Sequence, residues 1–188
     1  MPAAQDVLDF WFEPAHEASW FDRDEVFDAG IRARFGALHA AAARGELGAW
    51  ATSPAGWLAL LIVLDQFSRN LYRGEAGAFA CDAQAQRIAL AGLARGFDTE
   101  LPPLQRMFAY LPLEHAEDRA LQDRCVDLFA GLCAEAPGEG RYANYLDYAH
   151  RHRAVIERFG RFPHRNTALG RQSTDEEVHY LAQAGAGF

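Results

Sequence analysis

One stretch of the chain decides the fold: Ser53-Pro54-Ala55-Gly56-Trp57-Leu58-Ala59-Leu60-Leu61-Ile62-Val63-Leu64-Asp65-Gln66-Phe67. Ser53 can cap a helix, and Pro54 suits the first helical position because no intrahelical hydrogen bond is lost there. No polar residue interrupts the run from Trp57 to Leu64. A helix that is apolar on every side is buried on every side. We therefore predict a buried central helix; a buried strand is the alternative, but the length and the Ser-Pro start favour a helix.

Patterns on both sides of this stretch predict further helices. Apolar residues recur every three or four positions, which is the period of one helix face. Such stripes are Phe27, Ile31, Phe35 and Leu38, and also Leu121, Cys125, Leu128 and Leu132. No stretch alternates as a strand would. We predict an all-α fold of about eight or nine helices in a single domain, residues 1–188, with residues 184–188 as a frayed tail.

The second stripe carries an anomaly at its beginning. We expect Pro112 to end one helix and begin the next, so that the stripe continues backwards through Asp118 to Glu114. Two carboxylates would then lie where apolar residues are expected. The favourable field at a helix N-terminus is worth only about 0.3–1 kcal/mol, which does not offset burial of a charge. A positive partner is therefore predicted, unless the first turn of this helix projects beyond the core.

Composition excludes several classes of protein. Half of the residues are apolar and 12% are aromatic, so the chain can bury a core and is not disordered. The net charge of -8 argues against a general binder of nucleic acid or membrane surfaces. All 18 basic residues are arginine, which excludes Schiff-base chemistry on lysine. Three cysteines without a Cys-x-x-Cys pair or a signal peptide favour a cytoplasmic location.

Polar side chains gather in three places, each at a predicted helix end. The members are Arg69 and Asn70 after the central helix; Glu114, His115, Glu117 and Asp118; and His150, His152, Arg161, His164, Arg165 and Asn166. Guanidinium groups suit carboxylate or phosphate, and imidazole transfers protons near neutral pH. We predict that these clusters line one pocket for a small anionic molecule. A structural salt-bridge network between the arginines and the carboxylates is the alternative.

Within this predicted pocket, His150 and His164 are the candidates for acid–base catalysis. The candidate ligand-binding residues are Arg69, Asn70, Glu114, His115, Asp118, His152, Arg161, Arg165 and Asn166. Phosphate loops, dinucleotide fingerprints and nucleophile elbows are absent from the sequence. The histidines and carboxylates could also hold a metal, but the nearby arginines would repel it, so we predict no metal and assign no cofactor.

Four motifs, in this order, resemble those of a bacterial family catalogued as domain of unknown function 924 (DUF924). They are Val7-Leu8-Asp9-Phe10-Trp11-Phe12; Leu64-Asp65-Gln66-Phe67-Ser68-Arg69-Asn70-Leu71-Tyr72-Arg73-Gly74; Leu111-Pro112-Leu113-Glu114-His115-Ala116-Glu117-Asp118; and Arg158-Phe159-Gly160-Arg161-Phe162-Pro163-His164-Arg165-Asn166. The family usually has Pro at the position of Ser68. The resemblance implies a helical fold similar to the tetratricopeptide-repeat superfamily, an antiparallel array around the central helix. It implies no activity.

Three functions therefore remain open from the sequence. The first is a pocket for a small anionic molecule, with or without catalysis. The second is a helical scaffold for a protein partner, as helical arrays often provide. The third is a metal-dependent hydrolase. Neither nucleic acid nor a membrane is predicted as a partner, and whether the protein is an enzyme stays open.

Overall fold

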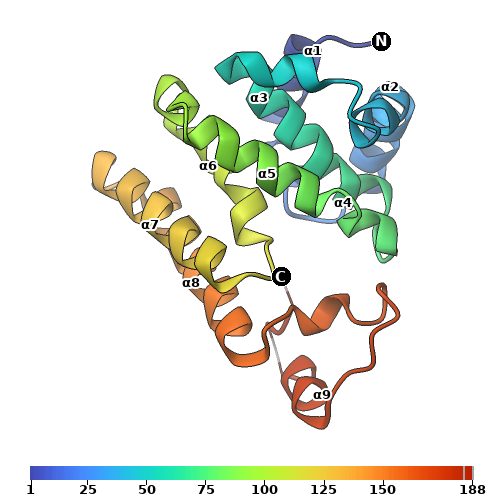
Figure 1. Ribbon diagram of the computed structural model, residues 1–188, viewed down its shortest axis with the longest axis vertical. Coiled ribbons are helices and arrows are strands. Elements are labelled where there is room, and N and C mark those ends of the chain that lie inside the picture. Colours follow the sequence, from blue (N-terminus) through green and yellow to red (C-terminus); the bar gives the residue numbers. More distant parts are fainter. Residues whose placement is uncertain (184, 188) are drawn as a thin grey trace. The chain divides into compact units, whose positions relative to one another are not determined.

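The computed structural model describes residues 1–183 and 185–187. Within those residues every regular element is helical, with nine α-helices and no strand (Figure 1). The predicted fold class and helix number are therefore confirmed. The chain divides into two compact units, residues 1–73 with 77–112, and residues 74–76 with 113 onward. The single domain and the tetratricopeptide-like array stay predictions.

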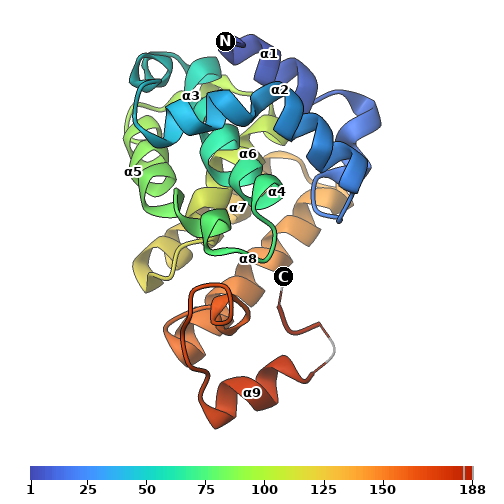
Figure 2. The ribbon, with the colours of Figure 1, turned by 90° about the vertical axis from the view of Figure 1, so that its right-hand side faces the viewer.

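The first unit contains six helices. They are α1 (Ala4–Trp11), α2 (Glu25–Ala43), α3 (Pro54–Leu61), α4 (Phe67–Leu71), α5 (Asp82–Leu93) and α6 (Pro103–Glu114), of which the last two residues belong to the second unit. α3 lies against α1 and α5, and α2 lies beside α4 (Figure 2). This arrangement surrounds α3 with other helices of the same unit.

The predicted central helix is confirmed, with one addition. Ser53 caps α3 by accepting a hydrogen bond from the Gly56 N–H at 3.3 Å, and the side chains from Trp57 to Leu64 are at most 2% exposed. Between α3 and α4 the chain forms a π turn over Ile62–Gln66, in which the Phe67 N–H donates to the Ile62 carbonyl. Such turns are rare and are frequent near functional sites. The apolar run did not predict this turn.

Aromatic side chains from the N-terminal helices form much of the core of the first unit. Trp11 meets Phe108 edge-to-face at 5.5 Å between ring centroids, and Trp20 meets it at 4.8 Å. The Trp20 indole donates to the Trp11 carbonyl at 2.8 Å. Edge-to-face pairs of this kind stabilise beyond the area they bury. Trp20 is therefore a core residue, whereas its neighbour Phe21 is 58% exposed.

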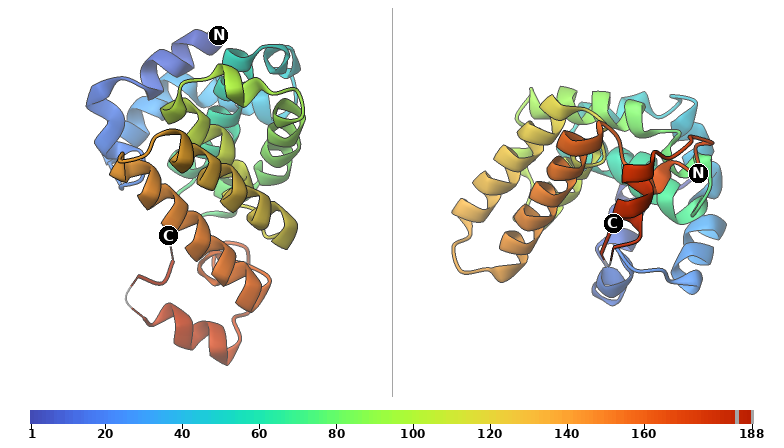
Figure 3. Two further views of the ribbon diagram at one scale, coloured as in Figure 1. Left: turned by 90° about the vertical axis from the view of Figure 1, so that its left-hand side faces the viewer. Right: turned by 90° about the horizontal axis from the view of Figure 1, so that it is seen from below.

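The second unit is built on a helical hairpin. α7 (Arg119–Glu135) and α8 (Gly140–Phe159) lie side by side and antiparallel, joined by a short loop (Figure 3). A short helix, α9 (Asp175–Leu181), follows a long connecting segment. Phe162 from that segment packs with Val155 and Ile156 of α8. The hairpin and the segment therefore share one small core.

The predicted helix break at Pro112 is wrong. Pro112 lies inside α6, which continues to Glu114. Proline in the last turn of a helix removes only one hydrogen bond, so the helix can continue for two residues beyond it. Because α7 begins at Arg119, Glu114 is not part of its stripe. Asp118 is an exposed cap whose Oδ1 accepts from the Leu121 N–H at 2.9 Å.

No helix in the described part of the chain has the length and apolar character needed to cross a membrane. Of the tail that we expect to fray, residues 184 and 188 lie outside the described residues. Gly187 lies against His164: a methyl group on Gly187 would come 3.3 Å from the His164 Cβ. This part of the tail is therefore close to one of the candidate site residues.

Candidate functional site

Glu114 is a buried carboxylate at the end of α6, with 5% of its surface exposed. The turn that follows it is held by Gln122 of α7. The Gln122 amide donates to the carbonyls of Glu114 and Ala116, at 2.6 and 2.9 Å. These are carbonyls that the end of α6 leaves without helical partners. Gln122 therefore fixes the segment that carries both Glu114 and His115.

His152 of α8 is the buried partner of Glu114. Its Nδ1 lies 2.9 Å from the Tyr148 carbonyl and 3.5 Å from Oε1 of Glu114. Because a carbonyl can only accept, Nδ1 carries a proton, and in the neutral ring Nε2 then has the lone pair. Burial is the main cause that lowers the pKa of His152 to about 3; repulsion from His115, Arg165 and His164 contributes to the same shift, and the hydrogen bond to Tyr148 opposes it. The imidazole is therefore neutral at physiological pH.

Phe162 lies at the centre of these positive groups. The His152 and His164 rings are each 5.6 Å from the Phe162 ring, and the Arg165 guanidinium carbon is 4.4 Å from its centre. The His115 ring is 6.2 Å from that of His152. Two histidines and an arginine thus lie around the Phe162 ring, and His115 lies next to His152. Arg165 is 5% exposed, whereas His115 and His164 are partly exposed.

Phe162 is itself held on both sides of its backbone by a charged pair. Oε1 of Glu117 accepts from the Phe162 N–H at 2.8 Å, and Arg171 donates to the Phe162 carbonyl at 3.0 Å. The two side chains also join through parallel hydrogen bonds of 2.7 and 2.9 Å. Arg171 and this N–H hold the pKa of Glu117 below its ordinary value, although burial opposes the shift. Paired hydrogen bonds of this kind fix geometry as well as charge.

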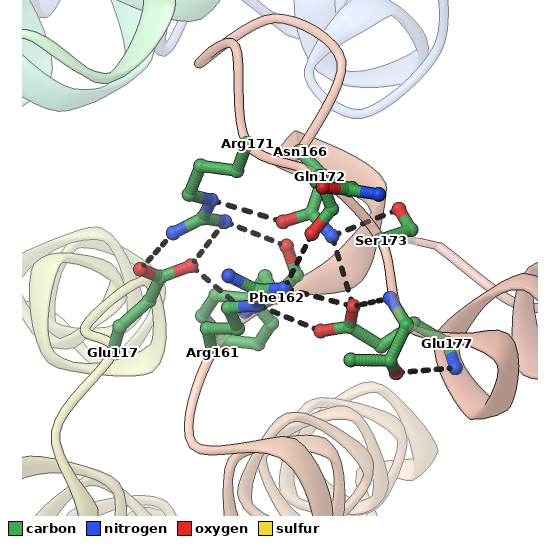
Figure 4. Close-up of polar contacts among 9 residues, drawn as sticks. Glu117, Arg161, Phe162, Asn166, Arg171, Gln172, Ser173 and Glu177 are labelled. Carbon is green, nitrogen blue, oxygen red and sulfur yellow. Dashed lines mark hydrogen bonds and ion pairs between the residues drawn. The ribbon is translucent and has the colours of Figure 1, made fainter.

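A second charged pair fixes the segment before α9. Arg161 donates to both oxygens of Glu177, at 2.7 and 2.9 Å, and Asn166 donates to the same carboxylate at 3.3 Å (Figure 4). Glu177 also accepts from the Thr174 N–H, which completes a capping box at the start of α9. The Arg161 hydrogen bonds are the largest of the causes that lower the pKa of Glu177 to about 2. This carboxylate is 2% exposed and ionised.

The sequence matches a known bacterial family over residues 7–185. The chain belongs to the family described as "Bacterial protein of unknown function (DUF924)". The resemblance seen in its four motifs is thereby confirmed. A solved structure from Agrobacterium tumefaciens, of a protein of unknown function, is similar with a TM-score of 0.85 and 44% identity. The match covers 95% of this chain and 96% of that one. None of the curated proteins matches the chain.

Five of the predicted site residues come together in the second unit of this DUF924 protein. They are Glu114, His115, His152, His164 and Arg165, which we call the histidine cluster. Arg161 and Asn166 instead bind the carboxylate of Glu177, a group that we call the Glu177 clamp. Asp118 caps α7. His150 is exposed on α8. Their functional roles stay predictions.

Arg69 and Asn70, the other two predicted residues, belong to the first unit. Arg69 lies 3.1 Å from Asp65 and 3.0 Å from Asp82, and Asn70 donates to Asp28 at 2.8 Å. That all the predicted residues share one pocket stays a prediction.

Ser68 occupies a position where the family usually has proline. Its hydroxyl forms two hydrogen bonds next to Arg69. It donates to the Leu64 carbonyl at 2.6 Å and accepts from His39 at 2.8 Å. The hydroxyl has a single proton, so the His39 Nε2 must be the donor.

Three important residues were missed or undervalued in the sequence. Gln122 and Arg171 lie in no recognised motif, and Glu177 was identified only as part of a capping box. Arg171 follows Gly170, whose φ of 64° lies in the left-handed region that favours glycine. A glycine followed by arginine shortly after the His-Arg-Asn loop was the available signal. It could not have indicated that the partner of Arg171 is Glu117.

Cys125 is a buried thiol close to this cluster. Burial raises its pKa well above the ordinary value, and the charge of Glu114 raises it further. A cysteine nucleophile needs the opposite, a lowered pKa that favours thiolate. Cys125 therefore serves as a small core residue. Among the described residues, no group of three or more His, Cys, Asp and Glu side chains is arranged to hold a metal ion.

Proposed function

We propose that the second unit binds a small anionic ligand at the histidine cluster, through His115, His164 and Arg165. One observation carries the proposal: the charges of these three groups all act on His152 and lower its pKa. Groups that disfavour a positive charge on one imidazole favour a negative charge nearby. An anionic ligand would relieve this repulsion. The cluster holds one arginine and three histidines beside a single carboxylate, Glu114, in a protein whose net charge is -8.

The chemistry of the cluster suits phosphate or carboxylate. Guanidinium forms paired hydrogen bonds with either group, and imidazolium adds a charged donor. Neutral His152 directs its Nδ1–H at the Tyr148 carbonyl. A pKa of about 3 makes His152 a poor base at neutral pH. For proton transfer we therefore propose His164, which is partly exposed, in preference to His152.

Other parts of the molecule fit an anion less well. The larger hollow in the first unit, about 520 Å³, is lined by Asp9 and Glu13 and by no basic side chain. Arg161 and Arg171 each form paired bonds with a carboxylate of the protein. For Arg161 and Arg171 the alternative raised by the sequence, a structural salt-bridge network, is therefore the better description. The scaffold and the metal-dependent hydrolase are supported by no specific observation among the described residues.

The proposal is tested by titrating the protein with inorganic phosphate and, separately, with acetate, while the histidine ring signals are followed by NMR. We expect saturable shifts of the His115, His152 and His164 signals with phosphate. His164→Gln should weaken binding at least tenfold. His150→Gln is the matched control, because His150 is an exposed histidine of α8. It should bind as the wild type does.

Two outcomes would overturn the proposal. The first is the absence of saturable change in all three ring signals with both anions. The second is an equal loss of binding in His150→Gln and His164→Gln. Arg165→Gln adds a further check, but Arg165 is 5% exposed and its removal can disturb folding. His164→Gln is therefore the decisive variant, and its folding is verified from the unchanged signals of α7 and α8.

A further inference from the structure

The first unit contains a small apolar groove that takes no part in the proposed function. It lies between α5 and the 3-10 helix Gly48–Thr52, beside α3. Its volume is about 210 Å³, and its lining residues are Ala51, Trp57, Arg87, Ile88, Ala91, Gly92 and Arg95. These residues include two arginines and no acidic side chain. The groove is thus both apolar and positively charged.

The floor of the groove is rigid because Trp57 lies beneath it. The Trp57 indole donates to the Ile88 carbonyl at 2.8 Å. Gly92 leaves the space that the indole fills: a Cβ there would come 2.2 Å from Trp57 Cε2. Ala91, one residue before, is exposed and small. The indole thus occupies the space that Gly92 leaves, and Ala91, which carries only a methyl group, lines the groove beside it.

The two arginines have different surroundings. Arg95 is anchored, since it donates to the Ala51 carbonyl at 3.2 Å and its guanidinium carbon lies 4.2 Å from the centre of the Phe97 ring. Arg87 is exposed and makes no hydrogen bond or ion pair with any residue that the structure describes. Arg95 thus forms a fixed wall at one end. Arg87 remains available to an anionic group from solution.

We infer that this groove binds a small single-ring carboxylate, with the ring over Ala91 and Gly92 and the carboxylate on Arg87. The size of the groove limits the ligand to one aromatic ring, because an apolar cavity of about 150 Å³ holds one benzene ring. The remaining space admits one short substituent. The positive charge of Arg87 favours a carboxylate as the substituent on this ring, because guanidinium forms two parallel hydrogen bonds with a carboxylate. Binding here is independent of anion binding at the histidine cluster.

The experiment uses benzoate as the probe, with the full chain labelled for NMR. We expect saturable shifts of backbone amides in residues 87–95 and around Ala51. Benzyl alcohol, which has the ring without the charge, and acetate, which has the charge without the ring, should each bind at least tenfold more weakly. Arg87→Gln should weaken benzoate binding at least tenfold, and Ala91→Leu, which fills the groove, should abolish it.

The matched control is Arg23→Gln. Arg23 is an exposed arginine of the same unit whose only described ion pair is with Glu25, and its loss changes the net charge equally. Benzoate affinity should be unchanged in this variant. The inference is overturned if benzoate gives no saturable shift, if benzyl alcohol binds equally well, or if Arg23→Gln costs as much affinity as Arg87→Gln. Ala91 is exposed, so Ala91→Leu leaves the core intact and tests the position directly.

Discussion

The first unit is held together largely by packing of aromatic rings. The irregular segment of the second unit is instead held by the ion pairs of two carboxylates. In the first, Trp11 and Trp20 each meet Phe108 edge-to-face, and Trp57 fills the space beside Gly92. In the second, Glu117 and Glu177 each bind an arginine through two hydrogen bonds. Apolar packing is insensitive to pH, but a carboxylate pair lasts only while the acid stays ionised.

This difference shows how an irregular segment can be ordered without a large core of its own. Residues 160–174 contain only one short 3-10 turn, Pro163–Arg165, yet Phe162 and Asn166 are at most 1% exposed. Their backbone and side-chain groups are satisfied by Glu117, Arg171 and Glu177. Buried polar groups need such partners to offset their lost hydration. The two charged pairs, Glu117–Arg171 and Glu177–Arg161, thus support the segment that contains His164 and Arg165.

The largest effect is expected from Gly92→Ala in the first unit. A Cβ at this position would overlap Trp57 at 2.2 Å, and the indole is enclosed on all sides. Overpacking of this kind typically costs 1–3 kcal/mol, and an overlap this close should cost about 3 kcal/mol. Denaturant unfolding followed by circular dichroism measures the change. Gly30→Ala is the control, because nothing lies within 4 Å of that position in α2.

In Gly30→Ala the added methyl group should stabilise the helix, by about 0.5–1 kcal/mol. If both variants change stability by similar amounts, the description of the first unit as closely packed around Trp57 is wrong.

A smaller effect, confined to acid, is expected from Glu177→Gln in the second unit. The folded-state pKa of about 2 lies below the ordinary value of 4.5, so the unfolded state binds more protons between these values. The stability from Glu177 is therefore complete above about pH 4.5 and is lost as the pH falls toward 2. Glu177→Gln should be less stable than the wild type at pH 7, and the two should converge near pH 2.

Unfolding curves between pH 2 and 7 measure this convergence. Glu176→Gln is the neighbouring control, since Glu176 is an exposed glutamate of the same helix. Its curve should run parallel to that of the wild type through this window. A constant difference between Glu177→Gln and the wild type at every pH would contradict the role of the ionised pair.

The smallest effect is expected from Asp147→Asn, which removes the ion pair with Arg151 on α8. The Asp147 and Arg151 atoms lie 2.8 Å apart, as close as in the pairs that Glu117 and Glu177 form, but both side chains are 59% exposed. Exposed pairs contribute about 0.5 kcal/mol or less because water and salt screen them. Thermal unfolding should shift by less than 2 °C. A larger shift would show that distance, not burial, decides the value of an ion pair in this protein.

The helical fold and the central helix were predictable because they depend on local patterns. The Ser53-Pro54 start and the unbroken apolar run determine α3 whatever surrounds it. The break at Pro112 was predicted wrongly because a proline removes one hydrogen bond and crowds the carbonyl four residues before it, which can bend a helix without ending it. The π turn after α3 has no apolar signature. Its existence depends on how the following residues pack.

The candidate site was predictable in composition but not in its pairings. Glu114 was expected to need a positive partner near the histidines; the side chain beside it is His152, which is neutral at physiological pH, so that expectation stays a prediction. Arg69, Arg161 and Arg165 were grouped as one set, although Arg161 binds Glu177, Arg165 belongs to the histidine cluster and Arg69 binds Asp65 and Asp82 of the first unit. Sequence shows that positive and negative residues are both present. Which of them meet is decided by the path of residues 160–177, which no periodic pattern describes.

The π turn over Ile62–Gln66 also sets the angular position of the polar residues that follow it. Each residue of an α-helix advances by about 100° around the axis. A deletion of one residue within the turn would restore a continuous α-helix and rotate Arg69 and Asn70 together by about that angle. Arg69 would then turn away from Asp82, and Asn70 from Asp28. One extra residue in the backbone thus sets the angle about the helix axis at which Arg69 and Asn70 leave the end of the buried helix.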